Sequence, residues 1–108
     1  MREAEDFLLT KIGEKMLIMT KYTIKPHISK AEHAEAMAKF AAFGEGPGEV
    51  VAHWAFADGS GGVNVIDTDD AEATLRNSLN YLPYLTTDFS MPVVTIDSAV
   101  PQIMDYLN

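Results

Sequence analysis

The sequence has no cysteine, and this absence excludes disulfides, thiolate metal sites and cysteine nucleophiles. Positive charge is also scarce: eight Lys and Arg stand against sixteen Asp and Glu, which gives a formal net charge of −8 at pH 7. Because such a charge repels nucleic acid and anionic membranes, we expect neither as a partner. We interpret the acidity itself as a contribution to solubility.

Long hydrophobic runs are absent too. The first residues are acidic where a secretory signal needs basic ones, and the apolar run Phe7 to Leu9 is too short for the centre of such a signal. Together with the lack of cysteine, this predicts a cytoplasmic protein. A length of 108 residues suits one domain. We expect residues 1–15 to be an extension, either a short amphipathic helix or disordered, and residues 16–108 to be the domain.

A β-hairpin is the clearest local feature. Bulky residues alternate at Trp54 and Phe56, the turn Asp58-Gly59-Ser60-Gly61-Gly62 follows, and a β-rich run resumes at Val63. If the loop closes symmetrically, Trp54 lies opposite Val65 and Phe56 opposite Val63, on one face of a sheet. We expect this apolar face to pack in the core, against helices.

The other face of the hairpin then carries His53, Asn64 and small residues such as Ala55 and Gly62. An expanse of small side chains with two polar ones leaves room for a ligand. We therefore expect a small-molecule pocket near His53 on a sheet face that the helices leave open.

The remaining elements follow from capping and periodicity. Met16 to Ile24 reads as a first strand and Met91 to Asp97 as a fourth. Ser29-Lys30-Ala31-Glu32 is a capping box that begins a helix to about Phe43, and Asp69 with Glu72 repeats the pattern before a second helix. The second helix is expected to bury Ala71, Leu75, Leu79 and Leu82. A short terminal helix is expected at Val100 to Leu107, with Pro101 in its first turn.

The element order is βαββαβ. With right-handed crossovers it predicts an α+β, ferredoxin-like domain, in which a four-stranded antiparallel sheet carries two helices on one face. The other sheet face is left uncovered, and a second copy of the chain is the simplest cover. We therefore expect a homodimer.

Several of these residues resemble the DUF3303 family of uncharacterised small proteins. They are Trp54, the Asp58-Gly59-Ser60-Gly61-Gly62 turn, Asp67-Thr68-Asp69-Asp70 and Met91-Pro92-Val93, and the resemblance covers about residues 16–97. It implies a dimeric α/β barrel, in which the open sheet faces of two ferredoxin-like subunits enclose a space. That wider superfamily includes cofactor-independent monooxygenases, isomerases, haem-handling enzymes and non-catalytic stress proteins, so the resemblance implies a fold more than an activity.

His53 is the leading candidate for a site, because an imidazole can act as acid, base or ligand near neutral pH. The plainer interpretation is a hydrogen-bonded interior histidine at a subunit interface. Tyr22 and Asn64 lie on strands that the topology makes neighbours, so they could hold a small polar ligand beside His53. Both could equally be ordinary strand residues.

Other groups suggest chemistry only weakly. His27 and His33 lack the spacing and number of ligands of a zinc site, and the acidic run at 67–70 is explained by helix capping. The glycine-rich turns carry no phosphate-binding signature. Methionines are read as core filler rather than haem ligands. We therefore expect no metal and no cofactor.

Three functions stay open. The first is a homodimeric small-molecule-binding protein, and the second is a small cofactor-independent enzyme, a monooxygenase or isomerase, in which His53 moves a proton. The third is a structural or regulatory assembly module without a ligand. An enclosed polar pocket would favour the first two, and a filled interior would favour the third.

Overall fold

The computed structural model describes residues 15–108, so the expectation for residues 1–15 falls outside it except at Lys15. Seven elements follow one another: β1 (Met16–Ile24), α2 (Lys30–Phe43), β2 (Glu49–Ala55), β3 (Gly61–Thr68), α3 (Ala71–Leu79), β4 (Leu85–Val93) and α4 (Ile96–Leu107). No helix within this part of the chain is both long and apolar enough to cross a membrane.

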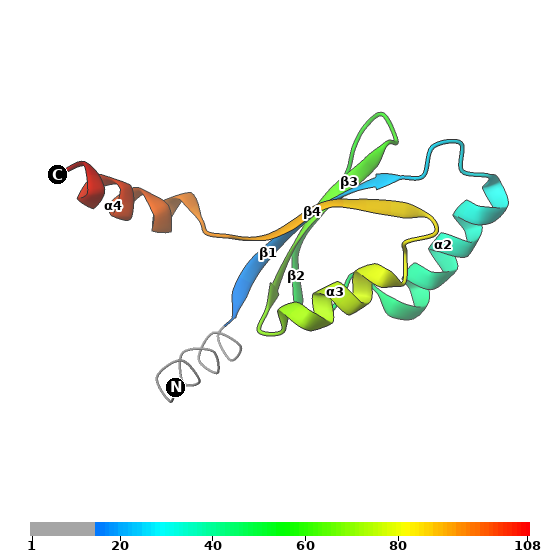
Figure 1. The fold of residues 1–108 in the computed structure, drawn as a ribbon, viewed down its shortest axis with the longest axis horizontal. Helices are drawn as coiled ribbons and strands as arrows, with labels where there is room; N and C mark the ends of the chain where they lie inside the picture. The colour runs from blue at the N-terminus through cyan, green and yellow to red at the C-terminus, as the bar shows by residue number, and fades with distance from the viewer. Residues whose placement is uncertain (1–14) are drawn as a thin grey trace.

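The four strands form one antiparallel sheet in the order β2-β3-β1-β4. Helices α2 and α3 lie on the same face of this sheet, and α4 extends away from it (Figure 1). This arrangement confirms the α+β, ferredoxin-like prediction. The buried apolar residues belong to the two central strands and to the segment after α3; they are Ile18, Val65, Ile66, Tyr81 and Tyr84.

Helix α2 begins as the sequence predicts. Ser29 Oγ accepts a hydrogen bond from the backbone N–H of Glu32, and a Glu32 carboxylate oxygen accepts one from the N–H of Ser29, which completes a capping box. Helix α3 differs, because its cap is Asp70 rather than Asp69. The Asp70 carboxylate accepts a hydrogen bond from the N–H of Ala73, so the expected second capping box does not form.

The last two elements begin earlier than expected. Strand β4 starts at Leu85 and ends at Val93, and α4 starts at Ile96, whereas the sequence pattern predicts a strand that continues to Asp97. Pro101 therefore lies inside α4 and not in its first turn. The polar run before Met91 belongs to β4 and pairs with β1 across a bulge. Thr95 ends the extended stretch because its hydroxyl caps α4 by accepting from the N–H of Ser98.

The hairpin groups its residues as predicted, but the covered face is the other one. Trp54 pairs with Val63 and His53 with Asn64, two residues away from the expected register, so the two pairs still occupy opposite faces. Helices α2 and α3 cover the face of His53 and Asn64. Trp54 lies on the uncovered face and is 60% exposed. The expectation that Trp54 packs against helices, and that His53 lies on the open face, is therefore wrong.

The prediction of which α3 residues are buried is also wrong. Ala71 is exposed, and Leu75, Leu79 and Leu82 are all more than half exposed, with Leu82 lying beyond the end of α3. Thr74 is the buried residue of the helix. The reason lies beneath α3, where Thr74 and Asn77 face a cavity rather than a packed apolar layer. Helical spacing identified a stripe of leucines correctly but not the direction in which it points.

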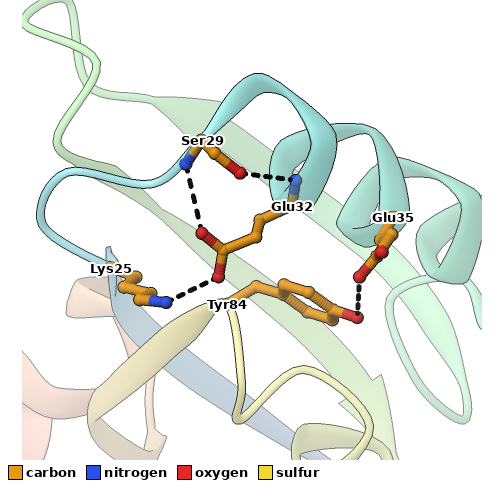
Figure 2. Close-up of polar contacts among 5 residues, drawn as sticks. All are labelled: Lys25, Ser29, Glu32, Glu35 and Tyr84. Carbon is orange, nitrogen blue, oxygen red and sulfur yellow. Dashed lines mark hydrogen bonds and ion pairs between the residues drawn. The ribbon is translucent and has the colours of Figure 1, made fainter.

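Helix α2 has no buried residue. Polar contacts, rather than apolar packing, therefore attach it to the rest of the domain. Figure 2 shows these contacts: Glu32, in its capping box, also pairs with Lys25, the residue after β1, with 2.5 Å between Lys25 Nζ and Glu32 Oε2. One turn later, Tyr84 Oη donates to Glu35 Oε2 over 3.0 Å. The helix is thus attached to β1 and to the segment before β4 while space remains beneath it.

Candidate functional site

A cavity of about 490 Å³ lies between the sheet and the two helices. Its floor includes Tyr22, His53 and Asn64 from three adjacent strands, and Met37 and Phe40 of α2 form part of its roof. Most of the lining is apolar. The predicted site residues therefore do come together, on the helix-covered face rather than the open one.

A chain of three side chains crosses this floor. Tyr22 Oη lies 2.7 Å from His53 Nε2, and His53 Nδ1 lies 2.5 Å from Glu45 Oε1. A carboxylate beside Nδ1 favours the tautomer with the proton on Nδ1, which leaves Nε2 to accept a hydrogen bond from the Tyr22 hydroxyl. Three parts of the fold thus converge: β1, β2 and the loop before β2.

Gly62 makes room for Tyr22. The two residues pair across β1 and β3, and a Cβ added to Gly62 would come within 2.8 Å of Tyr22 Cζ and 2.6 Å of the carbonyl oxygen of Trp54. With no Cβ at this position, the phenol can lie across the neighbouring strand and reach His53. The ring centroids of Tyr22 and His53 are 5.8 Å apart in an edge-on arrangement.

Glu45 is positioned by the loop that joins α2 to β2. The flanking Gly44 and Gly46 have φ of 70° and 123°, a region that favours glycine. Tyr81, which is 9% exposed, donates from Oη to the carbonyl oxygen of Gly44 over 2.6 Å. The hydrogen bond from Tyr81 therefore fixes the loop at Gly44, next to Glu45, whose carboxylate contacts His53.

The contact between Glu45 and His53 is close but not aligned as a hydrogen bond. Glu45 Oε1 is buried, and no group within residues 15–108 donates a well-directed hydrogen bond to it. The side chains of His53 and Glu45 are 27% and 16% exposed, so solvent screens their interaction only partly. We interpret the pair as a contact between the carboxylate charge of Glu45 and the polar N–H of the neutral imidazole, which orients the ring.

Burial and the Glu45 carboxylate also affect the pKa values of two tyrosines. Burial, followed by the negative charge of Glu45, raises the pKa of Tyr22 above its ordinary value of 10.0, and the same two causes raise the pKa of Tyr81. Both phenols are therefore protonated at neutral pH. Tyr22 faces His53 as a hydrogen-bond donor.

Asn64 adds a third polar group to the floor. It is 9% exposed and lies opposite His53 in the β2–β3 pair, and its Oδ1 is buried without a hydrogen-bond partner in the described chain. No Lys or Arg is among the described residues that line the cavity. Within residues 15–108, no three His, Asp or Glu side chains converge as a metal site requires.

Glu45 is the site residue that sequence reasoning missed. It stands in a glycine-rich loop that reads only as a helix stop, far from any recognised motif. The available signal was its setting between two glycines, a few residues before the strand that carries His53. Such a setting predicts an unusual backbone but not the direction of the side chain.

The three groups can move a proton. A histidine held by a carboxylate can accept a proton at Nε2, while the carboxylate stabilises the imidazolium that forms. Tyr22, which stays protonated, can donate a hydrogen bond to that nitrogen or to an oxygen of a bound molecule. The same groups also suit plain recognition, since convergent polar atoms at one end of an apolar cavity orient a ligand.

Comparison with known proteins gives a family and no activity. Searches of curated proteins and of solved structures each returned no match. Residues 16–106 match the family described as Domain of unknown function (DUF3303). The match covers most of the chain and agrees with the resemblance at Trp54, the hairpin turn and the acidic segment before α3. The chain therefore belongs to the DUF3303 family.

Proposed function

We propose that this protein binds a small molecule in the cavity between the sheet and helices α2 and α3. The observation that carries this proposal is an open space of about 490 Å³ with an apolar roof and convergent polar groups on its floor. Ligand cavities usually measure roughly 300–1,000 Å³ and have this kind of lining. A filled interior, which a module without a ligand would favour, is not what these residues form.

The charge of the lining residues limits the chemical class of the ligand. Glu45 contributes a carboxylate, and no described lining residue is Lys or Arg, so an anionic molecule would enter a site without a counter-charge. The ligand that this site supports best is uncharged and largely apolar, with a polar end that reaches Tyr22, His53 or Asn64.

A homodimer is part of the same proposal. The sheet face that carries Trp54 and Met91 is not covered by α2 or α3, and these side chains are 60% and 47% exposed. A face of this kind, rich in large apolar side chains, is the type of surface that subunits bury. A second copy covering it would leave the cavity, on the opposite face, free for a ligand.

Filling the cavity tests the binding proposal. Ala36 lines the space from α2, whereas Ala38 is an exposed residue of the same helix and not part of the lining. We expect Ala36→Trp to abolish the binding of Nile red, an uncharged apolar dye, in a fluorescence titration, and Ala38→Trp to leave its affinity within about twofold. Equal loss or equal retention in the two variants would refute binding in the cavity.

His53 gives a second test, through its polar contact. His53→Ala is expected to weaken the binding of a ligand that is recovered from the purified protein and identified by native mass spectrometry. The expected loss of affinity in calorimetry is about tenfold or more, equivalent to one hydrogen bond. His27→Asn is the control, since His27 is exposed and has φ of 58°, which Asn tolerates. Unchanged affinity in His53→Ala would show that the histidine is not part of the site.

A second candidate function is a cofactor-independent enzyme in which His53 moves a proton. The Tyr22–His53–Glu45 chain favours it, because a carboxylate behind an imidazole holds the ring in the tautomer and orientation that a general base needs. Exchange of an acidic C–H of the bound molecule into deuterated water, followed by NMR, tests this function. Glu45→Gln should slow exchange by about 10²-fold or more while affinity changes little, and an unaltered rate would leave only binding.

A further inference from the structure

Helix α4 has two unlike faces. Its apolar face consists of Ile96, Val100, Ile103, Met104 and Leu107, at spacings of three, four or one residues that place them on one side of a helix. Its opposite face consists of Ser98, Gln102 and Asp105. A helix with this pattern is ordinarily stabilised by burying its apolar side, because short helices have little stability of their own in water.

The chain does not bury that side. No residue of α4 is buried, and Ile103 and Leu107 are 52% and 67% exposed. Figure 1 shows α4 continuing outward from the end of β4, away from the sheet and the other helices. The Cα radius of gyration, 16.9 Å, exceeds the roughly 13 Å expected for a compact domain of this length. Helix α4 is thus a projecting arm.

The same chain carries a second unpartnered apolar surface, the sheet face opposite α2 and α3. We call it the open face; it includes Met19, Trp54, Val63, Phe89 and Met91. Register places these residues on one face: Met19 pairs with Met91, and Trp54 pairs with Val63. Lys21 lies between Val63 and Phe89 on the same face, so the apolar surface surrounds one cationic side chain. Every chain therefore offers one apolar arm and one apolar face.

The connection from β4 to α4 is short and leads the arm away from its own sheet (Figure 1). Only Val94 and Thr95 separate β4 from α4, and Thr95 is extended, with φ of −68° and ψ of 154°. Two extended residues span about 7 Å. Thr95 also caps the helix through the N–H of Ser98, which fixes the start of α4 in line with the edge strand.

A second copy of the chain can cover both apolar surfaces, the arm and the open face, at the same time. In a two-fold dimer the same contact is made twice, so each arm covers one face. An aromatic side chain buries about 150–250 Å² in full, so Trp54, which is 60% exposed, would contribute roughly 180–300 Å² from two copies. The aliphatic residues of two arms and two faces add to this, which reaches the range of about 1,200–2,000 Å² typical of a stable interface.

We propose that the chain forms a two-fold dimer in which α4 of each copy docks, apolar side down, on the open face of the other copy. This inference rests on the proposed homodimer and names the element that holds it together. The arm acts as a C-terminal clasp, and its occupant is another molecule of the same protein rather than an unrelated partner.

Charge placed on the arm tests the docking. We expect Ile103→Asp in the full-length chain to weaken dimerisation by at least about 100-fold in sedimentation equilibrium, since buried apolar anchors carry most interface energy. Gln102→Asp, on the polar side of the same helix, is the matched control and should leave the dissociation constant within about threefold. Circular dichroism and a thermal melt of each variant show whether the domain itself is intact.

Mixing two variants tests whether α4 of one copy docks on the open face of the other copy. Ile103→Asp spoils the arm and Trp54→Asp spoils the open face, so each variant alone should be monomeric. A mixed dimer keeps one intact arm on one intact face, and mixing should therefore restore dimers at a level between the variants and the wild type. No restoration would overturn the inference, because arms that pair with each other or fold back on their own sheet cannot complement in this way.

The outcomes also separate the inference from the homodimer on which it rests. A dimer that tolerates Ile103→Asp but not Trp54→Asp would show that the open face is covered without α4, which refutes the clasp and keeps the dimer. A dimer broken by Leu79→Asp and not by Trp54→Asp would place the arm on α3 and overturn the inference. A wild-type monomer at about 100 µM would overturn both.

Discussion

Gly62 lies directly against the phenol ring of Tyr22, and an added Cβ would come within 2.8 Å of Tyr22 Cζ. The absence of a side chain on β3 therefore allows a side chain on β1 to reach His53 on β2. Gly62 thus makes the contact between Tyr22 and His53 possible, although it takes no part in that contact.

Gly62→Ala is expected to displace Tyr22 from His53. Overpacking at a tight site destabilises a protein by roughly 1–3 kcal/mol, and the displaced hydroxyl no longer meets His53 Nε2. In urea unfolding and in ligand titration, Gly62→Ala should weaken both stability and binding. Tyr22→Phe is the comparison, because it removes the hydroxyl without moving the ring and should weaken binding with a smaller loss of stability. Full affinity in Gly62→Ala would show that Tyr22 keeps its place.

Trp54→Ala should hardly affect the stability of the monomer. The side chain is 60% exposed on the open face, so its removal leaves little cavity, and we expect a loss of about 1 kcal/mol or less. Urea melts at high dilution measure this. Ile18→Ala, a substitution at a residue that is 5% exposed, should lose about 2–5 kcal/mol in the same assay. A large loss for Trp54→Ala would instead place the indole in the core.

Alkaline pH should destabilise the fold through Tyr22 and Tyr81. Their pKa values are raised above 10.0 in the folded protein by burial and then by Glu45, so the unfolded chain releases these protons first. The contribution is fully present below about pH 10 and is lost as pH rises through the folded pKa values. Urea midpoints from pH 8 to 11.5 should fall, and Tyr22→Phe should flatten the fall. The exposed Tyr106 gives the control, Tyr106→Phe, which should leave the slope unaltered.

Acid should destabilise the attachment of α2. Hydrogen bonds from Lys25 and from the backbone of Ser29 lower the pKa of Glu32 below its ordinary value of 4.5. This contribution is present above about pH 4.5 and is lost as pH falls through the lowered pKa. Thermal melts between pH 7 and 2.5 should therefore depend on pH less steeply in Glu32→Gln than in the wild type. Glu72→Gln, at a side chain that is 89% exposed, should keep the wild-type slope.

Tyr81→Phe should release the loop that holds Glu45. The variant loses the hydrogen bond to the carbonyl oxygen of Gly44, a loss of about 1 kcal/mol in urea unfolding. Ligand affinity should fall as well, because Glu45 no longer orients His53. The check is an NMR titration of the His53 ring, whose chemical shifts should differ from wild type in Tyr81→Phe. Identical shifts would mean that the loop keeps its conformation without the phenol.

The topology of this protein could be predicted from local signals. Capping at Ser29, turn residues after Phe56 and β-branched runs each act over a few residues, and their order admits few compact folds. The pairing of His53 and Asn64 on one face also followed, because side chains alternate along a strand.

The covered side of the sheet could not be predicted in this way. Alternation groups Trp54 with Val63 but does not say which group meets the helices, and the usual assumption assigns the apolar group to the core. Here the helices cover a cavity, and the apolar group faces outward. Glu45 escaped prediction because only the paired conformations of two glycines and the distant Tyr81 direct its side chain toward His53.

The polar attachment of α2 also has a consequence for motion. A helix without buried residues can open by breaking a few hydrogen bonds, while the sheet beneath it stays intact. Amide protons of α2 should therefore exchange with solvent through local opening, at a lower free energy than those of β1 and β3. The roof of the cavity is then its gate, and a ligand that contacts Phe40 and His53 together would slow that exchange by holding the gate shut.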